Sequence, residues 1–133
     1  MKKIALSDNH KRVLESSIYL IEKLSLELEQ ELNGSNNKIM NNVINDEDEK
    51  KIYHINLLIQ EIKAEINFIT IKYNLKPVSH NLSQFIDSRK AKMWEILCDT
   101  KPEKLKGWGN FPKKYSKELD SDVDKLLKLV ESI

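Results

Sequence analysis

The sequence predicts an all-α protein, built as an antiparallel helical bundle of three long helices and a shorter C-terminal fourth. Along most of the chain, apolar residues recur at alternating spacings of three and four, which places them on one face of a helix. Gly and Pro number only 3 each, and charged residues make up 32% of the chain, a composition typical of long helices. No segment shows the alternation of a strand, and the mostly short links favour antiparallel neighbours.

Length and charge bound the class of protein. The 133 residues are expected to form a single helical-bundle domain, residues 1–133, whose core needs neither a metal nor a disulfide. The 22 Lys and Arg residues against 21 Asp and Glu leave a net charge of +1, so no overall field attracts nucleic acid or an acidic membrane surface. Cys98 is the only cysteine, which excludes an internal disulfide.

The sequence also indicates where the protein resides. Residues 1–6 begin like a signal peptide, but polar residues 7–12 interrupt the pattern before an apolar core of adequate length forms. No stretch is apolar for long enough to span a membrane. We therefore expect a cytoplasmic protein with no membrane partner, and the abundant Asn, Lys and Ile residues are typical of an AT-rich bacterial genome.

The first helix is expected to begin after Ser7, a favourable N-cap, and to end at Asn33 and Gly34. Tyr19 and Leu26 lie on its far side and are interpreted as isolated exposed residues. The expected core face carries Leu6, Val13, Leu14, Ser17, Leu20, Ile21, Leu24, Leu28 and Leu32. An Asn-rich connection follows over residues 33–45, with at most a turn or two of helix, and composition does not decide whether it is mobile or functional.

The central helix is expected over residues 46–73. Asn45 is the predicted N-cap, the acidic residues after it suit the positive end of the helix dipole, and Asn74 and Pro77 mark the end. The core stripe comprises Ile52, Ile55, Ile59, Ile62, Ile66, Ile69 and Tyr73.

This helix carries a second apolar stripe on nearly the opposite side, and two polar strips separate the stripes. A helix at the edge of a monomeric bundle needs only one apolar stripe, so a second predicts a second partner, either another helix of this chain or a second copy. One polar strip contains Asn56, Gln60, Lys63 and Asn67. The second stripe comprises Tyr53, Leu57, Ala64, Phe68 and Ile71.

The third helix is expected to begin near Ser79 or Asn81 and to end near Asp99. Its expected core face comprises Leu82, Phe85, Ile86, Met93, Ile96 and Leu97. Arg89 lies in the middle of that face, so we expect it to pair with a carboxylate of a neighbouring helix rather than with a bound anion. One helical turn is predicted from Pro102 to Gly107, followed by an irregular loop and a last helix from Ser116 or Asp120 to Ser132.

Residues 89–117 hold nine basic residues against three acidic ones, a net charge of +6. Lysines interleaved with aromatic residues suit single-stranded nucleic acid, because aromatic rings stack on bases and lysines neutralise phosphates. The competing interpretation, which the sequence favours, is that Trp108 and Phe111 fold back over the open end of the bundle. The residues assigned to a nucleic-acid or anionic-ligand site are Arg89, Lys104, Lys106, Trp108, Lys113 and Lys114.

No catalytic residue, metal site or cofactor is predicted. His10, His54 and His80 are too far apart to form a local metal motif, and Cys98 is expected at a helix end where the dipole disfavours a thiolate. The expected function is therefore non-enzymatic protein–protein contact, with a homodimer formed through the second stripe. Nucleic-acid or anionic-ligand binding through residues 89–117 is the alternative.

Overall fold

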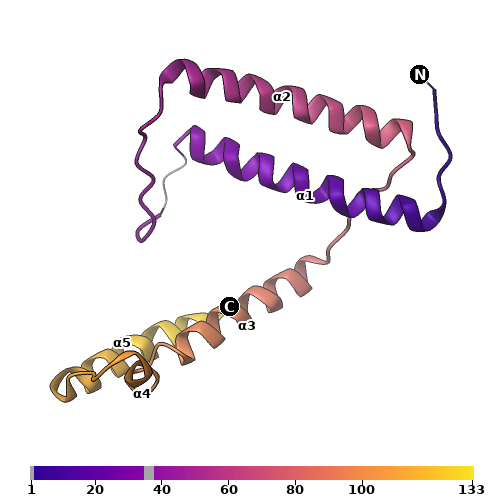
Figure 1. The fold of residues 1–133 in the computed structure, drawn as a ribbon. Coiled ribbons are helices and arrows are strands. Elements are labelled where there is room, and N and C mark those ends of the chain that lie inside the picture. The colour runs from indigo at the N-terminus through magenta and orange to yellow at the C-terminus, as the bar shows by residue number, and fades with distance from the viewer. Residues whose placement is uncertain (1, 35–37) are drawn as a thin grey trace. The chain divides into compact units, whose positions relative to one another are not determined.

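The computed structural model describes residues 2–34 and 38–133, which form helices and no strands, so the all-α prediction is confirmed (Figure 1). None of the helices in these ranges combines the length and apolar character needed to cross a membrane. The elements are α1 (Asp8–Leu32), α2 (Glu49–Lys72), α3 (Leu82–Cys98), α4 (Pro102–Leu105), the short 3-10 helix η1 (Lys106–Trp108) and α5 (Lys113–Glu131).

The chain divides into two compact units, Met1–Val78 and Ser79–Ile133. The first unit contains α1 and α2, and the second contains α3, α4, η1 and α5. The single domain and the four-helix bundle remain predictions.

The ends of α1 and α2 follow from local chemistry. Ser7 caps α1 as predicted, because its Oγ accepts a hydrogen bond from the backbone N–H of His10 at 3.2 Å. The N-cap of α2 is Asp48 rather than the predicted Asn45; the side chain of Asp48 accepts from the N–H of Lys50 at 3.1 Å. Asn45 instead accepts from the N–H of Glu47, which closes a turn before the helix. Of the predicted 33–45 connection, residues 35–37 lie outside the described residues, and residues 38–45 contain no helix.

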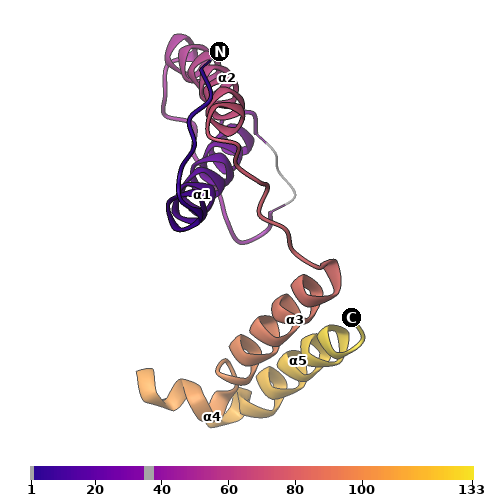
Figure 2. The same cartoon turned by 90° about the vertical axis from the view of Figure 1, so that its right-hand side faces the viewer.

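Helices α1 and α2 pack against each other in antiparallel directions and lie side by side in both views (Figure 1, Figure 2). Contacts join the end of α1 to the beginning of α2: the Asn56 amide donates to Asn33 Oδ1 at 3.4 Å. At the other end of the unit, the N–H of Ile4 donates to the carbonyl of Lys72 at 2.9 Å. The register between the two helices is therefore tied at both ends.

The core of the first unit is narrow. Ile59 is 1% exposed and Ile66 is 8% exposed, which confirms the central part of the isoleucine stripe, whereas Ile62 is 38% exposed. On α1 the buried residue is Ser25, and the expected leucine face is largely exposed, including Leu24 at 59%. A pair of helices buries only the strip where they meet. On α1 that strip includes half-buried Leu14 and Leu32 and leaves the leucines between them exposed.

The second unit pairs α3 with α5, again antiparallel and side by side in both views (Figure 2). The Lys90 ammonium donates to the backbone carbonyls of Glu131 and Ile133, at 3.1 Å each. Its buried apolar residues belong mainly to α5, with Val123 at 3% exposure, and α3 has no buried residue. The predicted core face of α3 is therefore largely exposed, with Leu97 half-buried.

Two features of the C-terminal half differ from prediction. Helix α5 begins at Lys113, three residues before Ser116, and its 19 residues exceed the 17 of α3, so the C-terminal helix is not the shorter one. The turn from Pro102 is present as α4, with proline at the first helical position. It continues into η1, which ends at Gly109; there φ is +139°, a conformation that favours glycine.

Candidate functional site

The second stripe of α2 lies exposed on the first unit. Among its members, Tyr53 is 67% exposed, Phe68 is 42% exposed, and Ala64 is also exposed. Leu57 and Ile71 are 47% and 45% exposed. The stripe therefore lies away from the side that α2 presents to α1. Whether a second molecule covers it remains a prediction.

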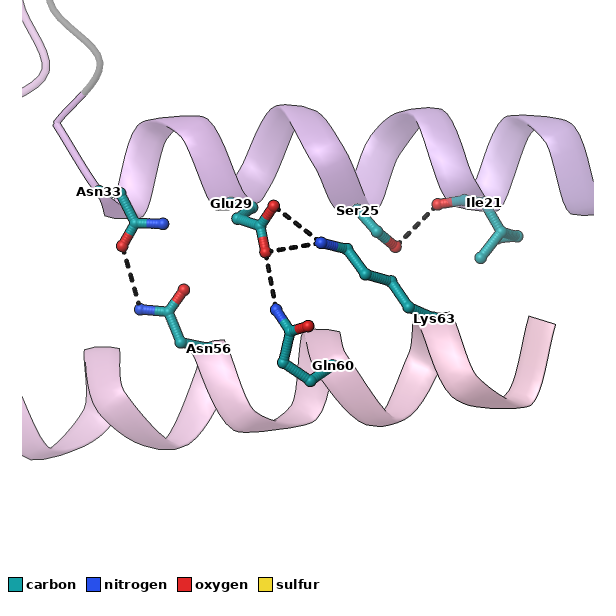
Figure 3. Close-up of polar contacts among 7 residues, drawn as sticks. All are labelled: Ile21, Ser25, Glu29, Asn33, Asn56, Gln60 and Lys63. Atoms are coloured by element: carbon teal, nitrogen blue, oxygen red, sulfur yellow. Dashed lines mark hydrogen bonds and ion pairs between the residues drawn. The ribbon is translucent and has the colours of Figure 1, made fainter. Parts of the chain in front are cut away.

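The polar contacts of Glu29 with Gln60 and Lys63, called here the polar ladder, show which side of α2 faces α1 (Figure 3). Both carboxylate oxygens of Glu29 accept from the Lys63 ammonium at 2.9 Å, and the Gln60 amide donates to Glu29 at 2.9 Å. The hydrogen bond from Lys63, reinforced by its charge and by Gln60, lowers the pKa of Glu29 despite some loss of hydration. Sequence analysis interpreted Gln60 and Lys63 as part of a strip that separates the two stripes. The structure places them against α1.

The polar ladder also identifies two edges of the helix pair. Because Glu29 reaches Gln60 and Lys63, the polar flanks of α1 and α2 lie along the same edge of their interface. On each helix the exposed apolar residues beside the interface, such as Leu24 on α1 and Ile62 on α2, lie on the other flank. The first unit thus has one polar edge, one apolar edge and, in addition, the second stripe.

A cavity of about 380 Å³ lies in the first unit, between α1, the end of α2 and the segment after it. One Glu15 carboxylate oxygen accepts from the backbone N–H of Lys76 at 2.5 Å, which holds that segment against α1. Apolar residues and the carboxylates of Glu15 and Glu22 line the cavity. Neither Cys98 nor any histidine is among its lining residues. Its lining residues are Glu15, Ile18, Tyr19, Glu22, Ile66, Thr70, Leu75, Lys76, Pro77 and Val78.

Trp108 is the most distinctive residue of the second unit, because 92% of it is exposed. The expectation that Trp108 folds back as a cap is therefore wrong. Within its unit, Trp108 extends into solvent from the end of η1, while Phe111 is half-buried. Gly109, which follows Trp108 directly, has a positive φ of 139°, a conformation that favours glycine.

The predicted basic residues divide into paired and unpaired groups. Lys101, which was not among the predicted site residues, bonds to Asp124 at 2.9 Å and lies 3.6 Å from Asp120. The hydrogen bond to Asp124, followed by the nearby charges, raises the pKa of Lys101. By contrast, four exposed lysines form no ion pair with any described residue: Lys104, Lys106, Lys113 and Lys114.

Arg89 is exposed, contrary to the expected burial in a core face. Its guanidinium carbon lies 4.8 Å from the centroid of the Phe85 ring, and it forms no ion pair with a described carboxylate. The arginine therefore packs on an aromatic face one turn earlier on the same helix, and it belongs to α3 rather than to the loop.

Two lysines converge on a hollow of about 280 Å³ beside the loop. Lys106 of η1 and Lys117 of α5 both line this hollow, together with Ser116, Glu103 and Asp120. The first turn of α5 adds Lys113 and Lys114 and contains no acidic residue. Packing of α4 against α5 thus brings the basic residues on either side of the loop to one end of the unit.

Sequence analysis missed the Glu29–Lys63 and Lys101–Asp124 pairs. Each pair joins residues more than twenty positions apart, which a local sequence pattern does not reveal. The one available signal was the spacing of Asp120 and Asp124, one helical turn apart on α5, which indicates a site for a cation such as Lys101. The described residues contain no group of three or more His, Cys, Asp or Glu that could hold a metal ion. Cys98 is half-buried at the end of α3.

Comparison with known protein families, with curated proteins and with solved structures finds no match to this chain.

Proposed function

We propose that this protein acts by protein–protein contact and forms a homodimer through the stripe of Tyr53, Leu57, Ala64, Phe68 and Ile71. The observation that carries the proposal is the two-sided use of α2. Helix α2 buries Ile59 and Ile66 against α1 and exposes this second apolar stripe to solvent. Monomeric soluble proteins rarely expose large contiguous apolar patches, and such patches mark interaction sites.

The spacing of the stripe suits a two-fold axis. Tyr53 and Ile71 lie nine residues on either side of position 62, while Leu57 and Phe68 lie five and six residues from it. In an antiparallel α2 to α2 contact, Tyr53 would meet Ile71 of the second copy, and Leu57 would meet Phe68. This is the self-complementary arrangement of an isologous dimer, in which one patch binds its own copy.

Small Ala64 occupies the middle of the stripe. A small side chain there lets the two helices approach closely where they cross, while the aromatic residues provide contact area toward each end. The assembly needs no cofactor. We place it in the cytoplasm, because the chain has a single cysteine and requires no oxidising compartment.

A pair of adjacent leucines provides a sharp test. Leu57 lies in the stripe and Leu58 does not, yet the two residues are 47% and 41% exposed on the same helix. The measurement is solution mass by size-exclusion chromatography with light scattering, and far-UV circular dichroism monitors the helices. We expect Leu57→Glu to shift the dimer to monomer with helix content retained, whereas Leu58→Glu remains dimeric. An equal effect of both variants, or none of either, would contradict the assignment.

A further inference from the structure

The exposed Trp108 has no structural role within its unit. Burying a tryptophan is among the largest apolar gains a side chain offers, yet this ring remains 92% exposed beside a half-buried Phe111. Trp108 is the last residue of η1, and Gly109 follows it with a positive φ. A large planar ring presented to solvent on a short, turned segment is suited to stacking on a planar ligand.

Positive charge surrounds the ring on both sides in the sequence. Lys104 and Lys106 precede it, Lys113 and Lys114 follow it, and all four are exposed without an ion pair to a described carboxylate. Asp124 bonds to Lys101, and Glu103 and Asp120 line the same hollow as Lys106 without forming an ion pair with it. The segment from residue 104 to residue 114 therefore contains four lysines and no acidic residue, in a chain whose net charge is only +1.

We infer that the segment from Lys104 to Lys114 binds single-stranded nucleic acid, with Trp108 stacking on a base and the four lysines contacting phosphates. Single strands expose the flat faces of their bases, and base–aromatic stacking combined with lysine contacts to the backbone is how sequence-tolerant binders hold them. The exposed Tyr115, with the Lys114 ammonium 4.9 Å from its ring centroid, supplies a second aromatic ring beside the lysines.

The observations favour a single strand over other polyanions. A duplex hides its base faces and would leave Trp108 without a stacking partner. An anionic membrane would favour several apolar side chains directed together into the lipid interface, whereas Trp108 is accompanied by lysines and a half-buried Phe111. This inference does not depend on self-association through α2, which belongs to the other unit.

The test is fluorescence anisotropy of a fluorescein-labelled oligothymidylate titrated with the full chain at low salt. Four lysine contacts predict that log K falls with log salt concentration with a slope of about −3, since each phosphate contact on a single strand contributes about 0.7. Trp108→Ala should weaken binding by about 5- to 150-fold, the equivalent of losing one stacked base. Trp108→Phe should restore most of the affinity, because it retains an aromatic face.

A matched control distinguishes binding by the loop lysines from a general attraction to any exposed lysine. Lys113→Gln with Lys114→Gln should reduce affinity and make the salt slope shallower, whereas Lys125→Gln, an exposed lysine further along α5, should leave both unchanged. Trp94→Phe leaves Trp108 as the only tryptophan, and its emission should be quenched by the oligonucleotide. Any of four results would overturn the inference. These are absence of binding, unchanged affinity in Trp108→Ala, equal affinity for duplex, and binding to phosphatidylserine vesicles in place of the oligonucleotide.

Discussion

The narrow core of the first unit predicts a specific stability difference between two isoleucines. Ile59→Ala removes three carbon atoms from a side chain that is 1% exposed. At about 0.8 kcal/mol per buried carbon the loss is about 2.4 kcal/mol, and the better helix propensity of alanine returns about 0.4 kcal/mol. The expected destabilisation is therefore about 2 kcal/mol, near the lower end for core truncations, because half-buried neighbours can collapse into the space.

Ile62→Ala is the matched control, one turn along the same helix. Ile62 is 38% exposed, so the same calculation gives about 1.5 kcal/mol of lost burial and a net loss of about 1 kcal/mol. Urea unfolding followed by circular dichroism at the helical band measures both variants. Equal losses for the two variants, or a larger loss for Ile62→Ala, would refute the placement of the core along Ile59 and Ile66.

Two further predictions concern a charge pair and a turn. The folded-state pKa of Glu29 is lowered, so the stability it provides is present above about pH 4.5, its ordinary value, and is lost as the pH falls through the folded pKa. Acid titration of unfolding should therefore show a weaker pH dependence in Glu29→Gln, and an unchanged pH dependence would contradict the assignment. Gly109→Ala should destabilise the second unit by about 1 to 3 kcal/mol, because φ is +139° there, as measured by thermal unfolding. Gly107→Ala, whose added carbon meets nothing within 4 Å, should be close to neutral, and equal effects of the two glycine variants would contradict the strain argument.

Local chemistry explains why most helix ends were predictable. Ser7 caps α1 with its own hydroxyl, Pro102 begins α4, and Asn74 adopts a positive φ of 51° just after α2. These signals act within three or four residues, so the sequence contains all the information they need. The start of α2 was misplaced because Asn45 and Asp48 both have capping side chains, and the helix begins after the second.

The sequence was a poorer guide to which faces of α1 and α2 contact each other. A stripe of leucines shows where α1 is apolar, but not which part of that surface a neighbour covers. In the first unit the contact runs through Ser25 and Glu29, because Glu29 finds Lys63 and Gln60 on α2. That choice depends on contacts between residues more than thirty positions apart, which periodicity alone does not encode.

For the candidate site around Trp108, the sequence predicted which residues are present but not which of them are exposed. The lysines around Trp108 were visible in the sequence, which favoured a folded-back Trp108 with solvated lysines over nucleic-acid binding. The 92% exposure of Trp108 and the pairing of Lys101, rather than of the loop lysines, with Asp124 could not be predicted from composition. Both are properties of the folded second unit.

Solution mass measured by light scattering across a range of protein concentrations is the most direct test of the proposed self-association. One chain has a mass of 15.6 kDa, so a homodimer is expected at twice that value, about 31 kDa, with dissociation on dilution. A mass of one chain at every concentration would contradict the account, and it would assign the exposed stripe of α2 to the chain's own fold or to a different protein.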